Sequence, residues 1–297
     1  MMEIAKLLRP KQWAKNLLVF AAIIFTGRVG ELEAVTHSLL AFVAMSLVSS
    51  ATYIANDIVD APKDRLHPKK KDRPVASGKV PSAVATALAA ILLLASVGTA
   101  WFIGSRGCLA LIGIYVAIQI AYNLKLKHIP ITDVFALSSG FVLRAALGAE
   151  AIDVKMSGWM FIVTGVLALT LGFAKRRNEF ILMGEDRSAS RAVLNEYSRQ
   201  TLDMLVLLFS GMSCMAYCIY SMESTTGRAH PALVLTTPMV IYAVARYIQR
   251  VFKDDEGGEP ADLLFKDPHI LIAVVLFVAA AVFAMTTGTH VPIIENR

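Results

Sequence analysis

Long apolar segments are the feature that most constrains how this chain can fold. Several of them approach the roughly 20 residues that an α-helix needs to cross the hydrocarbon core of a bilayer. Of the 297 residues, 56% are hydrophobic and only 18% are charged, which excludes a soluble globule and a disordered chain. Because a helix satisfies its own backbone hydrogen bonds in lipid, we expect an all-α, polytopic membrane protein.

Hydropathy marks nine spans, and they fill the chain so fully that we expect one integral membrane domain covering residues 1–297. The first span is short and follows basic residues, as a secretory signal does, but no small-residue cleavage site follows it. We therefore take it as a retained helix. The expected spans are 16–26, 38–55, 82–103, 107–122, 131–148, 158–174, 201–222, 231–248 and 270–287.

Basic residues are distributed very unevenly between the two sides of these spans. The side of the N-terminus holds 23 of the 29 Lys and Arg, when Arg246 at the end of the span 231–248 is counted with it. The other side holds five, and Arg144 lies well inside a span. The positive-inside rule then places the N-terminus and the long loops 56–81 and 175–200 in the cytoplasm and Arg297 outside a plasma (inner) membrane. Function is expected on the cytoplasmic face, whereas loop 253–260 is expected to be a flexible, solvated turn. The net charge of +6 requires no nucleic acid, since membrane lipids and anionic substrates are sufficient partners.

Acidic and amide side chains cluster where the second span ends. Asn56 and Asp60 lie one helical turn apart with Asp57 beside them, so their oxygens can converge. Asp64 would extend the row, although Pro62 is expected to disturb the helix there. Magnesium commonly binds one or two carboxylates together with substrate phosphates, so Asn56, Asp57 and Asp60 are candidate Mg²⁺ ligands. The other interpretation is a solvated loop with capping residues and ordinary positive-inside lysines.

This cluster resembles a known motif. The run Asn56-Asp57-x-x-Asp60-x-x-x-Asp64-Arg65, with Arg73-Pro74 downstream, looks like the first aspartate motif of the UbiA superfamily of intramembrane prenyltransferases. Four further segments resemble the branch of that superfamily that transfers 5-phosphoribose from phosphoribosyl pyrophosphate (PRPP) to a polyprenyl, specifically decaprenyl, phosphate. These segments are 9–16, 67–70, 122–128 and 139–144.

The resemblance implies a UbiA-like bundle of nine helices, a Mg²⁺ cofactor and release of diphosphate during synthesis of a cell-wall arabinan precursor. Members that use a prenyl diphosphate carry a second aspartate-rich motif after the sixth span, where this chain has Lys175-Arg176-Arg177-Asn178-Glu179. Cations there suit a lipid monophosphate or a ribose phosphate better than a second metal. The alternative is a positive-inside cluster that closes the span.

Arg144 is a charge inside a span, which costs about 2.5–3.5 kcal/mol at the bilayer centre on insertion scales. We favour a substrate phosphate as its partner over a structural pair with Glu150. The predicted catalytic residues are Asp57, Asp60 and Asp64. The predicted donor-binding residues are Lys15, Tyr53, Lys71 and Arg73, and the predicted acceptor-binding residues are Lys127, Arg144, Lys175 and Arg176.

The sequence is also compatible with two other functions. An aromatic or haem prenyltransferase of the same superfamily would hold a prenyl diphosphate at the aspartates. A lipid or anion transporter, which is not an enzyme, would also account for buried charge and many spans, although no inverted repeat is evident. The sequence does not distinguish a monomer from a homo-oligomer.

Overall fold

The computed structural model describes residues 2–65, 71–184, 192–258 and 260–287. The predictions for His67, Lys69, Lys70 and Arg297 lie outside these residues. Within them, eight helices are long and apolar enough to cross a membrane, which confirms an all-α integral membrane fold. They belong to α3 (Leu32–Asp64), α4 (Ser82–Ile103), α5 (Arg106–Leu124), α6 (Thr132–Ala151), α7 (Gly158–Met183), α9 (Arg199–Glu223), α11 (Thr237–Lys253) and α13 (Pro268–Thr287). The 3₁₀ helix η5 (Pro231–Thr236) extends α11 at its start.

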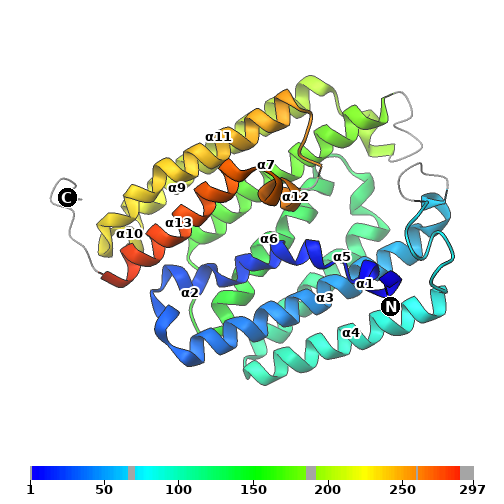
Figure 1. Cartoon of the computed structure of the whole chain (residues 1–297), viewed down its shortest axis with the longest axis horizontal. Coiled ribbons are helices and arrows are strands. Elements are labelled where there is room, and N and C mark those ends of the chain that lie inside the picture. The colour runs from blue at the N-terminus through cyan, green and yellow to red at the C-terminus, as the bar shows by residue number, and fades with distance from the viewer. Residues whose placement is uncertain (1, 66–70, 185–191, 259, 288–297) are drawn as a thin grey trace.

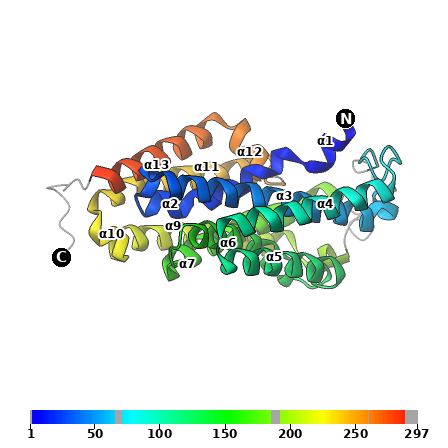
Figure 2. The same cartoon turned by 90° about the horizontal axis from the view of Figure 1, so that it is seen from below.

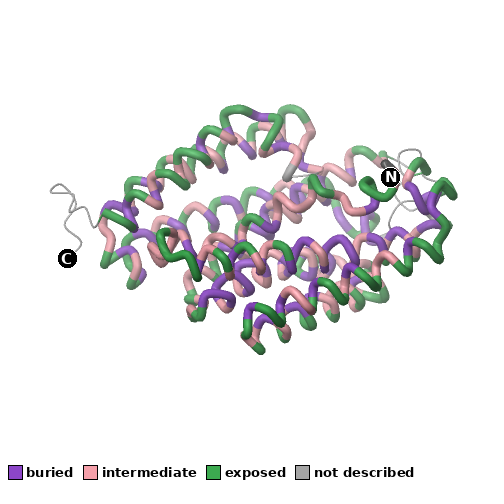
Figure 3. The backbone as a smooth tube through the Cα atoms, turned by 60° about the horizontal axis from the view of Figure 1, so that its bottom comes forward, coloured by how far each residue is buried: buried purple, intermediate pink, exposed green. Residues whose placement is uncertain are grey.

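These helices run along the long axis of the molecule (Figures 1 and 2). In Figure 1, α3 and α4 lie on one side, α9, α11 and α13 on the other, and α6 between them. Exposed positions follow the outer surface of the bundle (Figure 3); on α4 they include Leu94, Trp101 and Phe102, each more than 70% exposed. Apolar side chains that face outward in this way are suited to lipid.

The short elements are α1 (Met2–Leu8), η2 (Arg28–Gly30), η3 (Leu126–His128), η4 (Ala192–Glu196), α10 (Thr225–Ala229), η5 (Pro231–Thr236) and α12 (Pro260–Lys266).

The first expected span is not a regular α-helix. It consists of the 3₁₀ helix η1 (Pro10–Phe20, 11 residues) followed by α2 (Ala21–Phe25, 5 residues). A 3₁₀ helix rises about 2.0 Å per residue and an α-helix about 1.5 Å, so the pair extends about 30 Å. That length equals the hydrocarbon thickness, which explains how a segment so short in residues can span. The eight longer helices match eight of the nine spans expected.

Two helices extend beyond their expected ends. The helix α3 continues through Pro62 to Asp64, and α7 continues to Met183. The expected loop starts at 56 and 175 were therefore wrong, whereas the helical spacing expected for Asn56 and Asp60 is confirmed. Loop 253–260 also differs from the expected solvated turn, because Asp255 forms an ion pair with Arg177 of α7 at 2.9 Å. In each case tertiary partners beyond the span hold the backbone.

Close approach of η1 to α6 depends on Gly148. A Cβ atom at this position would lie 1.8 Å from the carbonyl oxygen of Val19. One turn earlier on α6, Arg144 Nε donates to Asn16 Oδ1 at 2.7 Å. The glycine therefore allows the N-terminal segment to reach the arginine.

We expect Gly148→Ala to lower the free energy of unfolding by about 1–3 kcal/mol, because the added methyl overpacks the contact with η1. The matched control is Gly113→Ala, since nothing lies within 4 Å of a Cβ placed there on α5. That variant should be neutral or slightly stabilising, because alanine is the better helix former. Equal melting temperatures in detergent for the two variants would contradict the predicted role of Gly148.

Candidate active site

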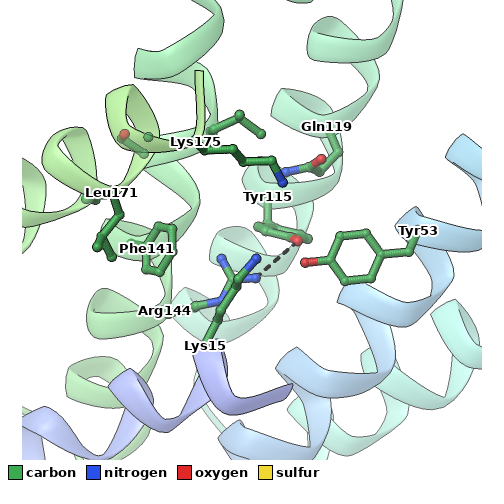
Figure 4. A pocket seen from close by; sticks show the side chains of 12 residues that line it. Lys15, Tyr53, Tyr115, Gln119, Phe141, Arg144, Leu171 and Lys175 are labelled. Carbon is green, nitrogen blue, oxygen red and sulfur yellow. Dashed lines mark hydrogen bonds between the residues drawn. The ribbon is translucent and has the colours of Figure 1, made fainter. Parts of the chain in front are cut away.

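A cavity of about 90 Å³ lies between η1, α3, α5, α6 and α7. Three cationic side chains converge on it, Lys15, Arg144 and Lys175 (Figure 4). Neither aspartate nor glutamate is among the described residues that line it. A space lined by three cations and no acid is suited to an anion such as a phosphate. The remaining lining residues are Tyr53, Tyr115, Gln119, Leu137, Ser138, Phe141, Ala168, Leu171 and Gly172.

Arg144 is only 4% exposed and is held by neutral groups. Besides the bond to Asn16, its guanidinium donates to the Gly140 carbonyl oxygen at 2.6 Å and to the Tyr115 hydroxyl at 3.4 Å. The Tyr115 and Phe141 rings face it at 5.3 and 5.6 Å. No carboxylate of the described residues forms an ion pair with it, so the alternative to a substrate phosphate, a structural pair with Glu150, does not form. A buried cation with neutral partners calls for an anionic ligand.

The cavity combines residues that we assigned to two different substrates. Lys15 and Tyr53 were expected to hold the donor, and Arg144 and Lys175 the acceptor, yet all four line one space. Tyr53 comes from α3 and Lys175 from α7, so the space closes only when helices distant in sequence pack together.

Next to this cavity, the acidic motif forms a paired cluster on α3. Asp57 is 2% exposed; its Oδ1 lies 2.5 Å from Arg9 NH2 and 3.1 Å from Arg73 NH1. Arg73 NH1 also lies 2.7 Å from Asp64 Oδ2. Two turns separate these aspartates along α3, so they share a face. Arg9 stacks over the Tyr53 ring at 5.3 Å, and Tyr53 therefore connects the cluster with the cationic cavity.

Asn56 and Asp60 form the neighbouring face of the same helix. Asp60 Oδ1 accepts from Lys127 Nζ at 3.2 Å, and the Asp60 side chain is 25% exposed. Asn56 Oδ1 is buried and has no hydrogen-bond partner in the described part of the chain. A buried acceptor left unpaired is costly, so a ligand for this oxygen is expected.

The side-chain oxygens of Asn56 and Asp60 fit a magnesium ion better than those of Asp57 do. Magnesium needs only one or two carboxylates when waters and substrate phosphates complete its shell. Among the described residues no three His, Cys, Asp or Glu side chains gather as metal ligands. Asp57, which was predicted to bind the metal, instead forms ion pairs with two arginines.

Arg176 and Lys71, two other predicted substrate contacts, lie away from the cavity. Arg176 is fully buried and forms ion pairs with Asp133 and with Glu179, the latter at 2.5 Å. Lys71 is exposed. Arg177 is also buried, with Asp203 Oδ1 2.6 Å from its Nε. Of the cationic motif on α7, only Lys175 therefore lines the cavity.

Several residues of the site were not assigned a role from the sequence. Arg9 and Asn16 belong to the segment that carried the resemblance, but nothing in their spacing indicated which groups they contact. Tyr115 and Gln119 lie one turn apart in a span. Of these residues, Gln119 could have been identified from the sequence, because an amide within an apolar span usually faces a cavity or another helix.

A helical membrane bundle with an acid-free cationic cavity beside an aspartate cluster defines an integral membrane protein built to hold anionic ligands. The family model described as the UbiA prenyltransferase family matches residues 17–266. The chain belongs to this family, and it is a membrane-embedded transferase. The transporter alternative is thereby superseded.

Two curated relatives named decaprenyl-phosphate phosphoribosyltransferase are each 30% identical to the chain. The one from Corynebacterium glutamicum aligns over 94% of this chain and 86% of its own length, and the one from Mycobacterium tuberculosis over 96% and 95%. Among solved structures, a UbiA homolog from Archaeoglobus fulgidus bound to GPP and Mg²⁺ aligns with a TM-score of 0.72. That alignment covers 96% of this chain and all of that chain at 18% identity, and it therefore supports the fold alone.

Proposed function

We propose that this protein transfers 5-phosphoribose from PRPP to a polyprenyl phosphate such as decaprenyl phosphate, releases diphosphate, and so makes a precursor of cell-wall arabinan. The observation that carries this proposal is the acid-free cavity of Lys15, Arg144 and Lys175 beside the aspartates of α3. Cations alone suit a phosphate monoester, whereas the neighbouring oxygen donors suit a metal-bound diphosphate. The names of the two relatives give the same transferred group, phosphoribosyl, and the same acceptor, decaprenyl phosphate.

Each substrate then has its own set of residues. Asn56 and Asp60 would hold Mg²⁺, with Asp57 and Asp64 acting through Arg9 and Arg73 at the same end of α3. Bound Mg²⁺ would supply neutralisation of the charge that develops on the diphosphate leaving group. Lys15, Arg144 and Lys175 would hold the lipid phosphate.

The residues need not supply a general base. A phosphate monoester is already ionised at neutral pH, so its oxygen can attack C1 of the ribose directly. The side chains would align the two substrates and stabilise charge while C1 gains oxocarbenium character. An in-line displacement would invert the configuration at C1.

The test compares donors with purified protein and Mg²⁺ in detergent. Labelled PRPP with a polyprenyl phosphate should give a phosphoribosylated lipid, and labelled prenyl diphosphate with 4-hydroxybenzoate should give no product. The opposite pattern would overturn the proposal and leave an aromatic prenyltransferase.

We also propose that the α3 aspartates face the cytoplasm of a plasma membrane, which the distribution of basic residues supports. Single cysteines at Ser77 and Lys155, two exposed positions, should report on the two sides after Cys214 and Cys218 are replaced by serine. In sealed, right-side-out vesicles an impermeant maleimide should label the cysteine at Lys155 and not the one at Ser77. Labelling of the Ser77 variant alone would reverse the orientation.

A further inference from the structure

The turn between α5 and α6 carries Lys127, which contacts Asp60 of the proposed donor site. Lys127 lies on η3 (Leu126–His128), and its Nζ is 3.2 Å from Asp60 Oδ1. A lysine side chain is long and mobile, so its ammonium group occupies one place only when the backbone beneath it is fixed. The structure shows what fixes this backbone.

Ile131, at the end of the turn, has an unusual conformation. Its φ is 66° and its ψ is −49°, a region that β-branched residues avoid. Such residues persist only where their surroundings hold them, and they gather at functional sites. The Ile131 amide donates to the Tyr197 hydroxyl at 2.5 Å, and that hydroxyl donates to Asp133 Oδ1 at 3.0 Å.

Arg176 connects both ends of the turn. Its Nε donates to Asp133 Oδ2 on α6, after the turn, and its NH2 donates to the Tyr122 hydroxyl on α5, before the turn, at 3.1 Å. Asp133 and Arg176 are both fully buried. Burial of the Tyr197 hydroxyl raises its pKa to about 12, so this group stays protonated at physiological pH and can donate to Asp133.

We infer that Arg176, Asp133 and Tyr197 are positioning residues that hold the 125–131 turn so that Lys127 meets Asp60 in the donor site. The inference rests on the proposed function for the identity of the donor. It assigns Arg176 a role different from the substrate contact expected from the sequence, because this arginine acts through the turn and not on a phosphate.

The test uses Tyr197→Phe, which removes the hydroxyl and keeps the ring. Its matched control is Tyr247→Phe, since Tyr247 is buried to the same degree (8% against 7% exposed) and its hydroxyl has no hydrogen-bond partner among the described residues. Tyr197→Phe should speed hydrogen–deuterium exchange in a peptide covering 126–135 about tenfold and raise the KM for PRPP about fivefold to tenfold, with kcat changed less than twofold. Tyr247→Phe should change none of these quantities.

A double variant separates positioning from general stability. If Tyr197 acts through Lys127, the KM of Tyr197→Phe/Lys127→Gln should equal that of Lys127→Gln alone. Additive effects, or unchanged exchange in Tyr197→Phe, would overturn the inference. Hydrogen–deuterium exchange requires no substrate. If the protein fails to use PRPP, the proposed function is refuted, but the exchange measurement still decides whether Tyr197 holds the turn.

Discussion

Replacement of Arg144 by glutamine should reduce the rate of transfer about a hundredfold to a thousandfold while the protein stays as stable as the wild type. Removing one preorganised donor to a developing or bound oxyanion commonly costs this much. Stability should not fall, because among the described residues Arg144 donates only to neutral oxygens and its loss leaves no carboxylate unpaired. A buried cation without a counter-ion is itself unfavourable, so the melting temperature in detergent should be equal or higher.

The matched comparison is Arg176→Gln, the same substitution at another buried arginine. It leaves Asp133 fully buried and unpaired, and breaking a buried ion pair in this way costs about 3–5 kcal/mol of unfolding free energy. We therefore expect a large fall in melting temperature for Arg176→Gln and none for Arg144→Gln. Normal turnover by Arg144→Gln, or a loss of stability as large as that of Arg176→Gln, would refute the role of Arg144 in binding an anion.

The contrast between these two arginines shows how much the sequence could predict. Hydropathy predicts spans, and the span 82–103 coincides with α4. Hydropathy cannot distinguish a cation that faces a cavity from one that pairs with a distant acid, since that depends on packing between helices. Arg144 lines a cavity and does not pair with Glu150, whereas Arg176 meets Asp133, which lies 43 residues away in the chain.

The ends of the helices illustrate the same limit. Pro62 suggested that the α3 helix would break, because proline removes a backbone donor and crowds the preceding turn. The helix nevertheless continues to Asp64, whose carboxylate is paired with Arg73. A polar helix beyond a membrane span is stabilised by such side-chain partners, and a hydropathy pattern contains no information about them.

We expect Asp60→Asn to lower turnover at least about a hundredfold with little change in stability, because the carboxylate would be needed for the metal that neutralises the leaving group. Asp60 is partly exposed, and its one ion pair within the described part of the chain is with Lys127, so its loss leaves no described buried arginine unpaired. The Mg²⁺ concentration for half-maximal activity should also rise. Asp72→Asn is the matched control, since Asp72 is exposed and close in sequence, and it should retain normal activity.

Asp57→Asn should behave differently, and this difference tests the division of the aspartates into two faces. Asp57 is buried between Arg9 and Arg73, so the substitution should lower both turnover and the melting temperature. If Asp57→Asn loses activity and stability while Asp60→Asn loses activity alone, then Asp60 faces the donor and Asp57 orders the arginines around it. Near-normal activity of Asp60→Asn at limiting Mg²⁺ would remove the metal from this face of α3 and leave the aspartates a purely structural role.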